Sequence, residues 1–356
     1  KIMHPKKMLY FDCMRFFKTL LVFMAPLISF LTFQADEYFP PHRDDWEYWA
    51  STILSARGAN PLIALYLNRL SRPSIFPGFG IPFFLATGSV HVSTMLVMPI
   101  FFAVFSLASY LFFRKWIDQF DAILFSLVLS FAPIVFNSSL YYMTELPLLS
   151  FVCMALLLFT YSDRRIAHFF AGLFAGISLT IRPLEAIYFW LLLLPFGLYR
   201  NGLVCFVVTA FSFGAVWFYP SLHEAYRWIS GALFDYHNQI NVNSSSSYTA
   251  RILDSGDLVF RLFTPIGTCV LMALIFHLYR REKVKTRFAW LVVGALFPQI
   301  LSIFLRNRPT AHELRYHILL VPLLIGFILL KLHGYKKAYA RFFSLALLAN
   351  FMYFLP

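Results

Sequence analysis

The sequence predicts an all-α integral membrane protein, a multi-pass bundle of about 9–11 transmembrane helices. The chain has 356 residues, of which 60% are hydrophobic and only 13% are charged, and its mean hydropathy is +0.68. A soluble domain of this length cannot hide so much apolar surface in one core. Aromatic residues reach 19%, with 43 Phe, which suits lipid-facing and helix-packing surfaces.

Apolar segments of a length suited to crossing a membrane recur along the whole chain. A helix needs about 20 apolar residues to span the hydrocarbon core. The predicted spans lie near residues 17–34, 92–113, 121–137, 146–161, 166–181, 185–199, 202–220, 257–279, 287–305, 316–332 and 341–356. We therefore expect a single transmembrane module over residues 1–356.

The basic residues predict one topology. Lys6, Lys7, Arg15 and Lys18 precede the first span and indicate a cytoplasmic N-terminus. Further basic residues recur at every second crossing, as the positive-inside rule requires. They are Arg114, Lys115, Arg164, Arg165, Arg200, the run from Arg280 to Lys285, and the run from Lys331 to Lys337. The larger loops 38–91 and 221–256 then fall on the extracytoplasmic face.

The net charge of +13 does not indicate a nucleic-acid partner. The basic residues gather in short loops between apolar runs, which is typical of contact with anionic lipid headgroups. The four cysteines, Cys13, Cys153, Cys205 and Cys269, show no metal-ligand spacing. We interpret them as packing residues, with no structural disulfide and no zinc site.

Carboxylates gather directly after the first span. Asp36, Glu37, Asp44, Asp45 and Glu47 fall within a dozen residues, at the predicted water edge of the membrane. An enzyme acting on a lipid-linked substrate needs its catalytic base at such a place, although a plain solvated loop has the same composition. Residues 45–57 predict an amphipathic interfacial helix that Gly58 ends, and a second short helix follows Pro77 through Ala86.

Several short motifs follow one another along the chain, and their order is informative. They are the Asp-x-x-Tyr-Trp helix starting at Asp45, Gly58-x-Asn60-Pro61, Arg72-Pro73, Thr144-Glu145-Leu146-Pro147, Ile181-Arg182-Pro183 and Glu313-Leu314-Arg315-Tyr316. Over roughly residues 17–330 this order resembles the GT-C glycosyltransferases. These are multi-pass enzymes that take a sugar from a polyprenyl-phosphate carrier, such as protein O-mannosyltransferases and the bacterial lipid A aminoarabinose transferase.

The resemblance implies a GT-C fold with extracytoplasmic juxtamembrane helices. It also implies transfer of a sugar, with inversion, from a polyprenyl-phosphate donor to an acceptor on the extracytoplasmic face. The membrane is the bacterial inner membrane or the endoplasmic reticulum, and the sequence identifies neither the sugar nor the acceptor. A non-catalytic carrier or flippase for lipid-linked sugars is the alternative function.

Such a transfer requires a carboxylate that removes the proton of the acceptor hydroxyl. Asp45 and Asp44 are the first candidates, and Asp36 with Glu37 is the rival pair. Asp45 at the start of a helix is also placed to act as an N-cap. An adjacent acidic pair could bind a divalent cation together with a phosphate, so metal dependence stays open.

The leaving phosphate requires cationic donors. Arg315 is the first candidate and Arg182 the second, because a guanidinium at the hydrocarbon edge must find an anion. Glu313 could pair with Arg315, and Glu185, three residues after Arg182, could neutralise that arginine. The predicted substrate-binding set is Arg315, Arg182, Glu145, Tyr316 and His312. The aromatic residues Trp46, Tyr48, Trp49, Tyr141 and Tyr142 are interpreted as interfacial belt residues.

Overall fold

The computed structural model describes residues 19–35, 43–58, 76–161, 164–193 and 318–353, together with a few isolated positions. These positions are Val207, Thr268, Cys269, Met272, Ile275, Phe276, Trp290, Val293 and Gly294. The predicted spans 202–220, 257–279 and 287–305 fall outside this part of the chain apart from those positions, and the loop 221–256 falls outside it entirely.

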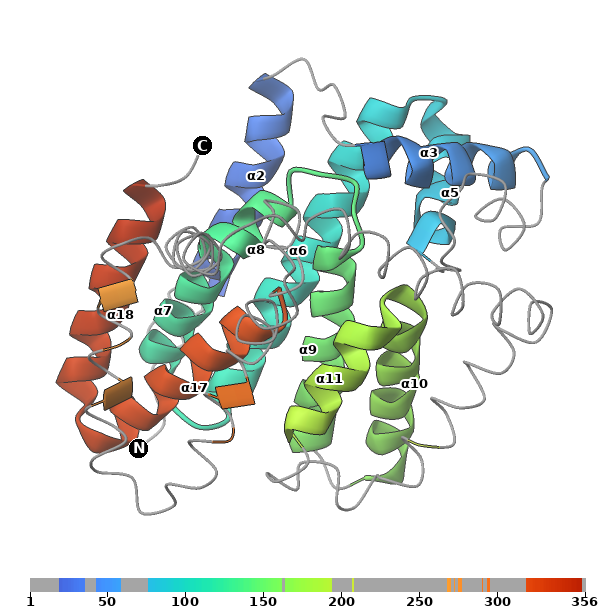
Figure 1. The fold of residues 1–356 in the computed structure, drawn as a ribbon. Coiled ribbons are helices and arrows are strands. Elements are labelled where there is room, and N and C mark those ends of the chain that lie inside the picture. The colour runs from blue at the N-terminus through green and yellow to red at the C-terminus, as the bar shows by residue number, and fades with distance from the viewer. Residues whose placement is uncertain are drawn as a thin grey trace, which may run out of the picture.

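The described residues form helices and turns, and they contain no strand (Figure 1). A short 3₁₀ turn, η1 (Leu21–Phe23), comes first. The α-helices are α2 (Met24–Ala35), α3 (Arg43–Ala56), α5 (Phe76–Thr87), α6 (Val90–Arg114), α7 (Gln119–Ser130), α8 (Pro133–Ser138), α9 (Glu145–Tyr161), α10 (Arg165–Ile181), α11 (Pro183–Leu193), α17 (Leu320–Tyr335) and α18 (Lys337–Tyr353). The prediction of an all-helical protein is confirmed for this part of the chain.

The helices coincide with the apolar segments of the sequence. Within the described residues, only α6 has both the length and the hydropathy of a complete membrane span, and the other apolar helices have 10–17 residues. The amphipathic helix expected from residue 45 is α3, followed by Gly58 with a positive φ of 94°. The second short helix is α5.

The predicted span 121–137 is wrong as a single helix. It consists of α7 and α8, separated at Phe131 and Ala132. Pro133 occupies the first turn of α8, where its missing N–H costs nothing. The same proline inside a continuous helix would remove one backbone hydrogen bond and clash with the preceding turn.

Serine side chains join the central helices. Ser106 on α6 lies 3.0 Å from the hydroxyl of Ser130, and Ser126 donates to the Ser106 carbonyl at 3.0 Å. Ser150 on α9 donates to the carbonyl of Phe101 on α6 at 2.7 Å. Small polar residues allow close helix approach and replace the hydrophobic driving force that is absent between helices in lipid. They fix α7 and α9 on either side of α6.

The two ends of the bundle differ. Figure 1 shows α3 and α5 at the upper end, whereas the turns that follow α6, α9 and α17 lie at the lower end. Those turns carry the basic residues that predict the cytoplasmic side. The orientation of the bundle in a membrane stays a prediction.

A buried carboxylate holds the lower end together. Asp121 on α7 is fully buried and accepts from Arg341 Nε on α18 at 2.6 Å, while His333 Nε2 on α17 lies 2.9 Å from its second oxygen. Lys337 bonds to Asp118, whose side chain also accepts from the Asp121 N–H at 3.1 Å. We call Asp118, Asp121, His333, Lys337 and Arg341 the lower ion cluster.

The lower ion cluster also keeps Asp118 ionised. Partial burial alone raises the pKa of Asp118. The hydrogen bonds from Lys337 and from the Asp121 N–H, with the charges of Lys337 and Arg341, outweigh burial and lower this pKa to about 2. Asp118 is therefore a carboxylate at neutral pH and caps α7 with a full charge.

At the upper end, a second cluster joins α3 and α5 to the start of α9. The rings of Trp49 and Tyr142 stack with centroids 3.9 Å apart, and Phe76 packs against Tyr142 at 4.5 Å. The hydroxyls of Tyr142 and Thr52 lie 3.2 Å apart. Gly80 faces this hydroxyl so closely that a Cβ would collide with it. We call Trp49, Thr52, Phe76, Gly80 and Tyr142 the Tyr142 cluster.

Asp121→Asn is expected to destabilise the fold by about 1.5–3 kcal/mol, because it removes the charge that holds α17 and α18 on α7. Asp118→Asn is the matched control. Its carboxylate is 41% exposed and asparagine still caps α7, so we expect a loss of about 0–1 kcal/mol. Thermal unfolding in detergent micelles, followed by tryptophan fluorescence, measures both. Equal melting temperatures for the two variants would contradict the central role of Asp121.

Gly80→Ala is expected to destabilise the protein by about 1–3 kcal/mol through overpacking against Tyr142 and Thr52. Gly78→Ala is the control on the same helix, because its Cβ meets nothing within 4 Å. The control should gain about 0.4–1 kcal/mol from the better helix residue. Adding Tyr142→Phe to Gly80→Ala removes the colliding hydroxyl and should restore part of the melting temperature. A single Gly80→Ala variant as stable as Gly78→Ala would refute this packing.

Candidate functional site

The most distinctive polar group in the described chain is Arg182, at the turn between α10 and α11. α10 ends at Ile181, and Arg182 adopts an extended conformation with φ −146° and ψ 90°. Pro183 then begins α11 and lacks the N–H that would continue α10. The Arg-Pro pair therefore reverses the chain and leaves the arginine side chain between three helix ends.

Two carboxylates flank the guanidinium. Arg182 Nη2 lies 3.3 Å from Oε1 of Glu145, the first residue of α9, and Nη1 lies 3.3 Å from Oε1 of Glu185 in the first turn of α11. The Arg182 and Glu145 side chains are 5% and 2% exposed, and Glu185 is 15% exposed. We call these three residues the Arg182 triad.

The triad carries one more negative charge than positive. Both glutamates lie in the first turn of a helix, where the helix dipole favours a carboxylate. A buried guanidinium without an anion is costly, so the ion pairs stabilise this turn. The arrangement gives a carboxylate held rigidly at the start of α9.

The Tyr142 cluster connects α3 to the segment that leads into α9. Tyr142 precedes Glu145 by three residues, and it stacks on Trp49 of α3. Asp44 and Asp45 lie one helical turn before Trp49, in the first turn of α3. The backbone of the predicted catalytic acids is thus joined, through one aromatic stack, to the helix start that carries Glu145.

The structure describes some of the predicted site residues and not others. Glu145 and Arg182 are neighbours in the triad, and the ion pair expected between Arg182 and Glu185 is present. α3 begins at Arg43, so Asp45 lies inside its first turn and not at the N-cap position. Asp36, Glu37, His312, Arg315 and Tyr316 lie outside the described residues. The catalytic and binding roles of all these residues stay predictions.

The interpretation of the aromatic residues as a membrane belt is wrong for two of them. Trp49 and Tyr142 are both fully buried and pack against each other. Thr52, three residues after Trp49 on the same helix face, was the signal that this face packs inward. The sequence did not identify its partner, because α3 and Tyr142 are separated by more than 80 residues.

A cation site within the described residues is geometrically conceivable only at the lower end. The ligand atoms of Asp118, Asp121 and His333 lie within 4.8 Å of one another. However, Lys337 and Arg341 already bond to both carboxylates, as in an ion-pair cluster. The Arg182 triad gives no additional evidence for a divalent cation. Metal dependence therefore stays an open question.

No protein-family model and no curated protein matches this chain. Among solved structures, the chain is similar to ArnT from Cupriavidus metallidurans, crystallised with bound undecaprenyl phosphate, with a TM-score of 0.61 and 14% identity. The match covers 87% of this chain and 60% of that chain, so this chain spans less than two thirds of the length of ArnT. ArnT is the lipid A aminoarabinose transferase, a GT-C enzyme. The resemblance to GT-C enzymes is therefore confirmed at the level of the fold.

Proposed function

We propose that this protein is a membrane glycosyltransferase that moves a sugar from a polyprenyl-phosphate carrier to an acceptor on the extracytoplasmic face. The observation that carries the proposal is the fold shared with ArnT, whose structure contains undecaprenyl phosphate. A second support is the arrangement of charged groups. The Arg182 triad and the first turn of α3 lie at the same end of the bundle, as a reaction at one membrane face requires (Figure 1).

In this reaction a carboxylate of the Asp44 and Asp45 pair, or of Asp36 and Glu37, removes the proton from the acceptor hydroxyl. The acceptor oxygen bonds to the anomeric carbon as the bond between that carbon and the carrier phosphate breaks. The leaving group is the polyprenyl phosphate, whose negative charge Arg315 binds through its planar fork. His312 and Tyr316 would contact the same phosphate or the acceptor.

Arg182 and Glu145 have a supporting role in this proposal. The guanidinium is already paired with two carboxylates, so its positive charge is largely neutralised. It therefore suits the positioning of Glu145 better than the capture of a second anion. The Glu145 side chain is only 2% exposed, so in this proposal it holds the start of α9 against the turn between α10 and α11 and does not contact the sugar itself.

Loss of one acidic pair is expected to abolish sugar transfer. Membranes that hold the protein are supplied with a panel of radiolabelled polyprenyl-phosphate sugars, and release of the sugar is measured. Asp44→Asn with Asp45→Asn is compared with Asp36→Asn with Glu37→Gln. Removing the general base should lower turnover by about 10²–10⁴-fold in one double variant and much less in the other.

The two double variants serve as controls for each other, because each removes two negative charges from the same short stretch of sequence, residues 36–45. Correct folding is checked by the melting temperature. If the wild type transfers no sugar from any donor but binds donors saturably, and Arg315→Ala weakens that binding, the carrier or flippase function replaces the enzyme.

The role of Arg182 can be separated from its contribution to stability. Arg182→Gln alone leaves two buried carboxylates without their cation and should destabilise the fold by about 3–5 kcal/mol. The triple variant Arg182→Gln, Glu145→Gln, Glu185→Gln contains no charge in the triad, so its melting temperature should return close to that of the wild type.

Transfer activity of the folded triple variant then decides the role. We expect turnover to fall by about 10-fold or more, since ion pairs no longer hold the start of α9 against the turn between α10 and α11 and the reacting groups are misplaced. Glu185→Gln alone is the matched control, because it removes the more exposed acid and keeps the Arg182 to Glu145 pair. Full activity in the triple variant would show that the triad serves only the fold.

A further inference from the structure

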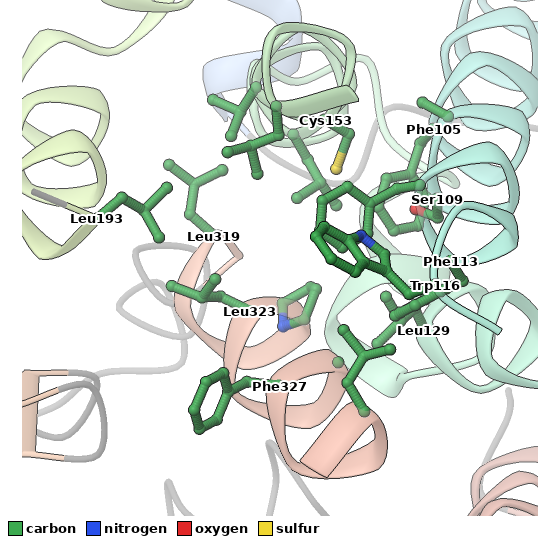
Figure 2. A pocket seen from close by; sticks show the side chains of 18 of the residues that line it. Phe105, Ser109, Phe113, Trp116, Leu129, Cys153, Leu193, Leu319, Leu323 and Phe327 are labelled. Atoms are coloured by element: carbon green, nitrogen blue, oxygen red, sulfur yellow. The ribbon is translucent and has the colours of Figure 1, made fainter. Parts of the chain in front are cut away.

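A large apolar cavity, separate from the Arg182 triad, lies between α6, α7, α9, α11 and α17 (Figure 2). Its volume is about 580 Å³. One face of α6 lines it at helical spacing, through Phe105, Ser109 and Phe112, and Trp116 lines it from the turn that follows α6. α17 supplies the opposite wall. A cavity of this size falls in the range of pockets that hold small organic ligands, about 300–1,000 Å³.

The cavity extends from the buried middle of the bundle to the surface at its lower end. At the inner end Phe105 and Leu149 are 0% and 2% exposed. At the outer end Trp116 is 57% exposed and Gly334 is exposed as well. A ligand can therefore enter the cavity from the lower end, with its apolar part inserted first.

Two lysines are placed at the outer end, each over an aromatic ring of the cavity wall. Lys115 Nζ lies 5.6 Å from the centroid of Trp116, and Lys331 Nζ lies 5.6 Å from that of Phe327. Lys331 also lines the cavity itself.

We infer that this cavity binds an anionic phospholipid of the adjacent leaflet, with one acyl chain between α6, α9 and α17 and the headgroup phosphate at Lys115 and Lys331. The apolar walls suit a hydrocarbon chain, and the positive mouth suits a phosphate. Basic pockets between membrane helices recognise anionic headgroups in this way. The inference depends on the membrane location and not on glycosyl transfer.

The location of the opening distinguishes this ligand from the sugar donor of the proposed function. The outer end of the cavity is lined by Trp116, Lys331 and Gly334, in or next to the basic turns that predict the cytoplasmic side. Figure 1 shows the turns after α6 and α17 at the lower end, whereas the start of α9 and the turn between α10 and α11 lie at the ends of these helices nearer α3. A donor whose phosphate sits at the upper end would approach the cavity with its chain from the opposite direction. The phosphate of a phospholipid in the lower leaflet meets the two lysines directly.

The test uses a phosphatidylglycerol with a photoreactive diazirine in one acyl chain, incubated with the full-length protein in micelles of a neutral detergent. After irradiation, mass spectrometry locates the labelled residues. We expect labels on cavity residues such as Phe112, Cys153 and Phe327. Labelling by the matched phosphatidylcholine should be weaker by about fivefold for each lysine that the headgroup contacts.

Lys115→Gln with Lys331→Gln should abolish the preference for phosphatidylglycerol. The matched control is Arg165→Gln with Lys336→Gln, which removes two exposed cations from the same end without touching the cavity, since Lys336 lies over Tyr339. It should keep the preference.

Cys153→Phe, which places a ring in the cavity, should remove the cavity labels while exposed positions such as Phe169 and Phe170 keep their background labelling. Equal labelling by the two lipids would overturn the inference, and so would labels restricted to such outer positions. Displacement of the label by undecaprenyl phosphate at lower concentration than by unlabelled phosphatidylglycerol would overturn it as well, in favour of the carrier lipid.

Discussion

The pairing of the Arg182 guanidinium is the constraint on which the upper end of the bundle depends. A buried positive charge must be matched by anions, and here the anions come from the first turns of two different helices. One side chain therefore fixes the end of α10 and the beginnings of α9 and α11 together. Because Tyr142 leads into α9, the same constraint sets where α3 and α5 pack.

At the lower end of the bundle the buried charge has the opposite sign. There the buried charge is the carboxylate of Asp121, and His333 of α17 and the cationic Arg341 of α18 approach it from outside. The result is an end rich in positive charge, beside an apolar cavity, whereas the Arg182 triad carries one more negative charge than positive. This asymmetry agrees with the different chemistry that we propose for the two ends: acid-dependent transfer at one and contact with anionic lipid at the other.

The sequence allowed most of the helices to be predicted, because hydropathy, proline and glycine are local signals. α6, α9 and α10 lie where the apolar runs predict them, and α3 and α5 follow from the amphipathic pattern and Pro77. The break between α7 and α8 was missed, although Pro133 marks it. Contacts between distant segments could not be predicted. Asp121 meets Arg341 after 220 residues, and neither residue alone differs from an ordinary interfacial charge.

The ion pairs of Arg182 make it a poor binding site for a phosphate. From the sequence, Arg182 and Glu145 are separate candidates, yet in space they form one ion pair at 3.3 Å. A phosphate that approached this guanidinium would bring a third negative charge next to two carboxylates, in a region where water screens little. It would have to displace one of them, and Glu185 is the more exposed. Leaving the phosphate to Arg315 and using Arg182 to hold Glu145 avoids this repulsion, and it gives Arg182 and Glu145 roles that agree with their burial and pairing.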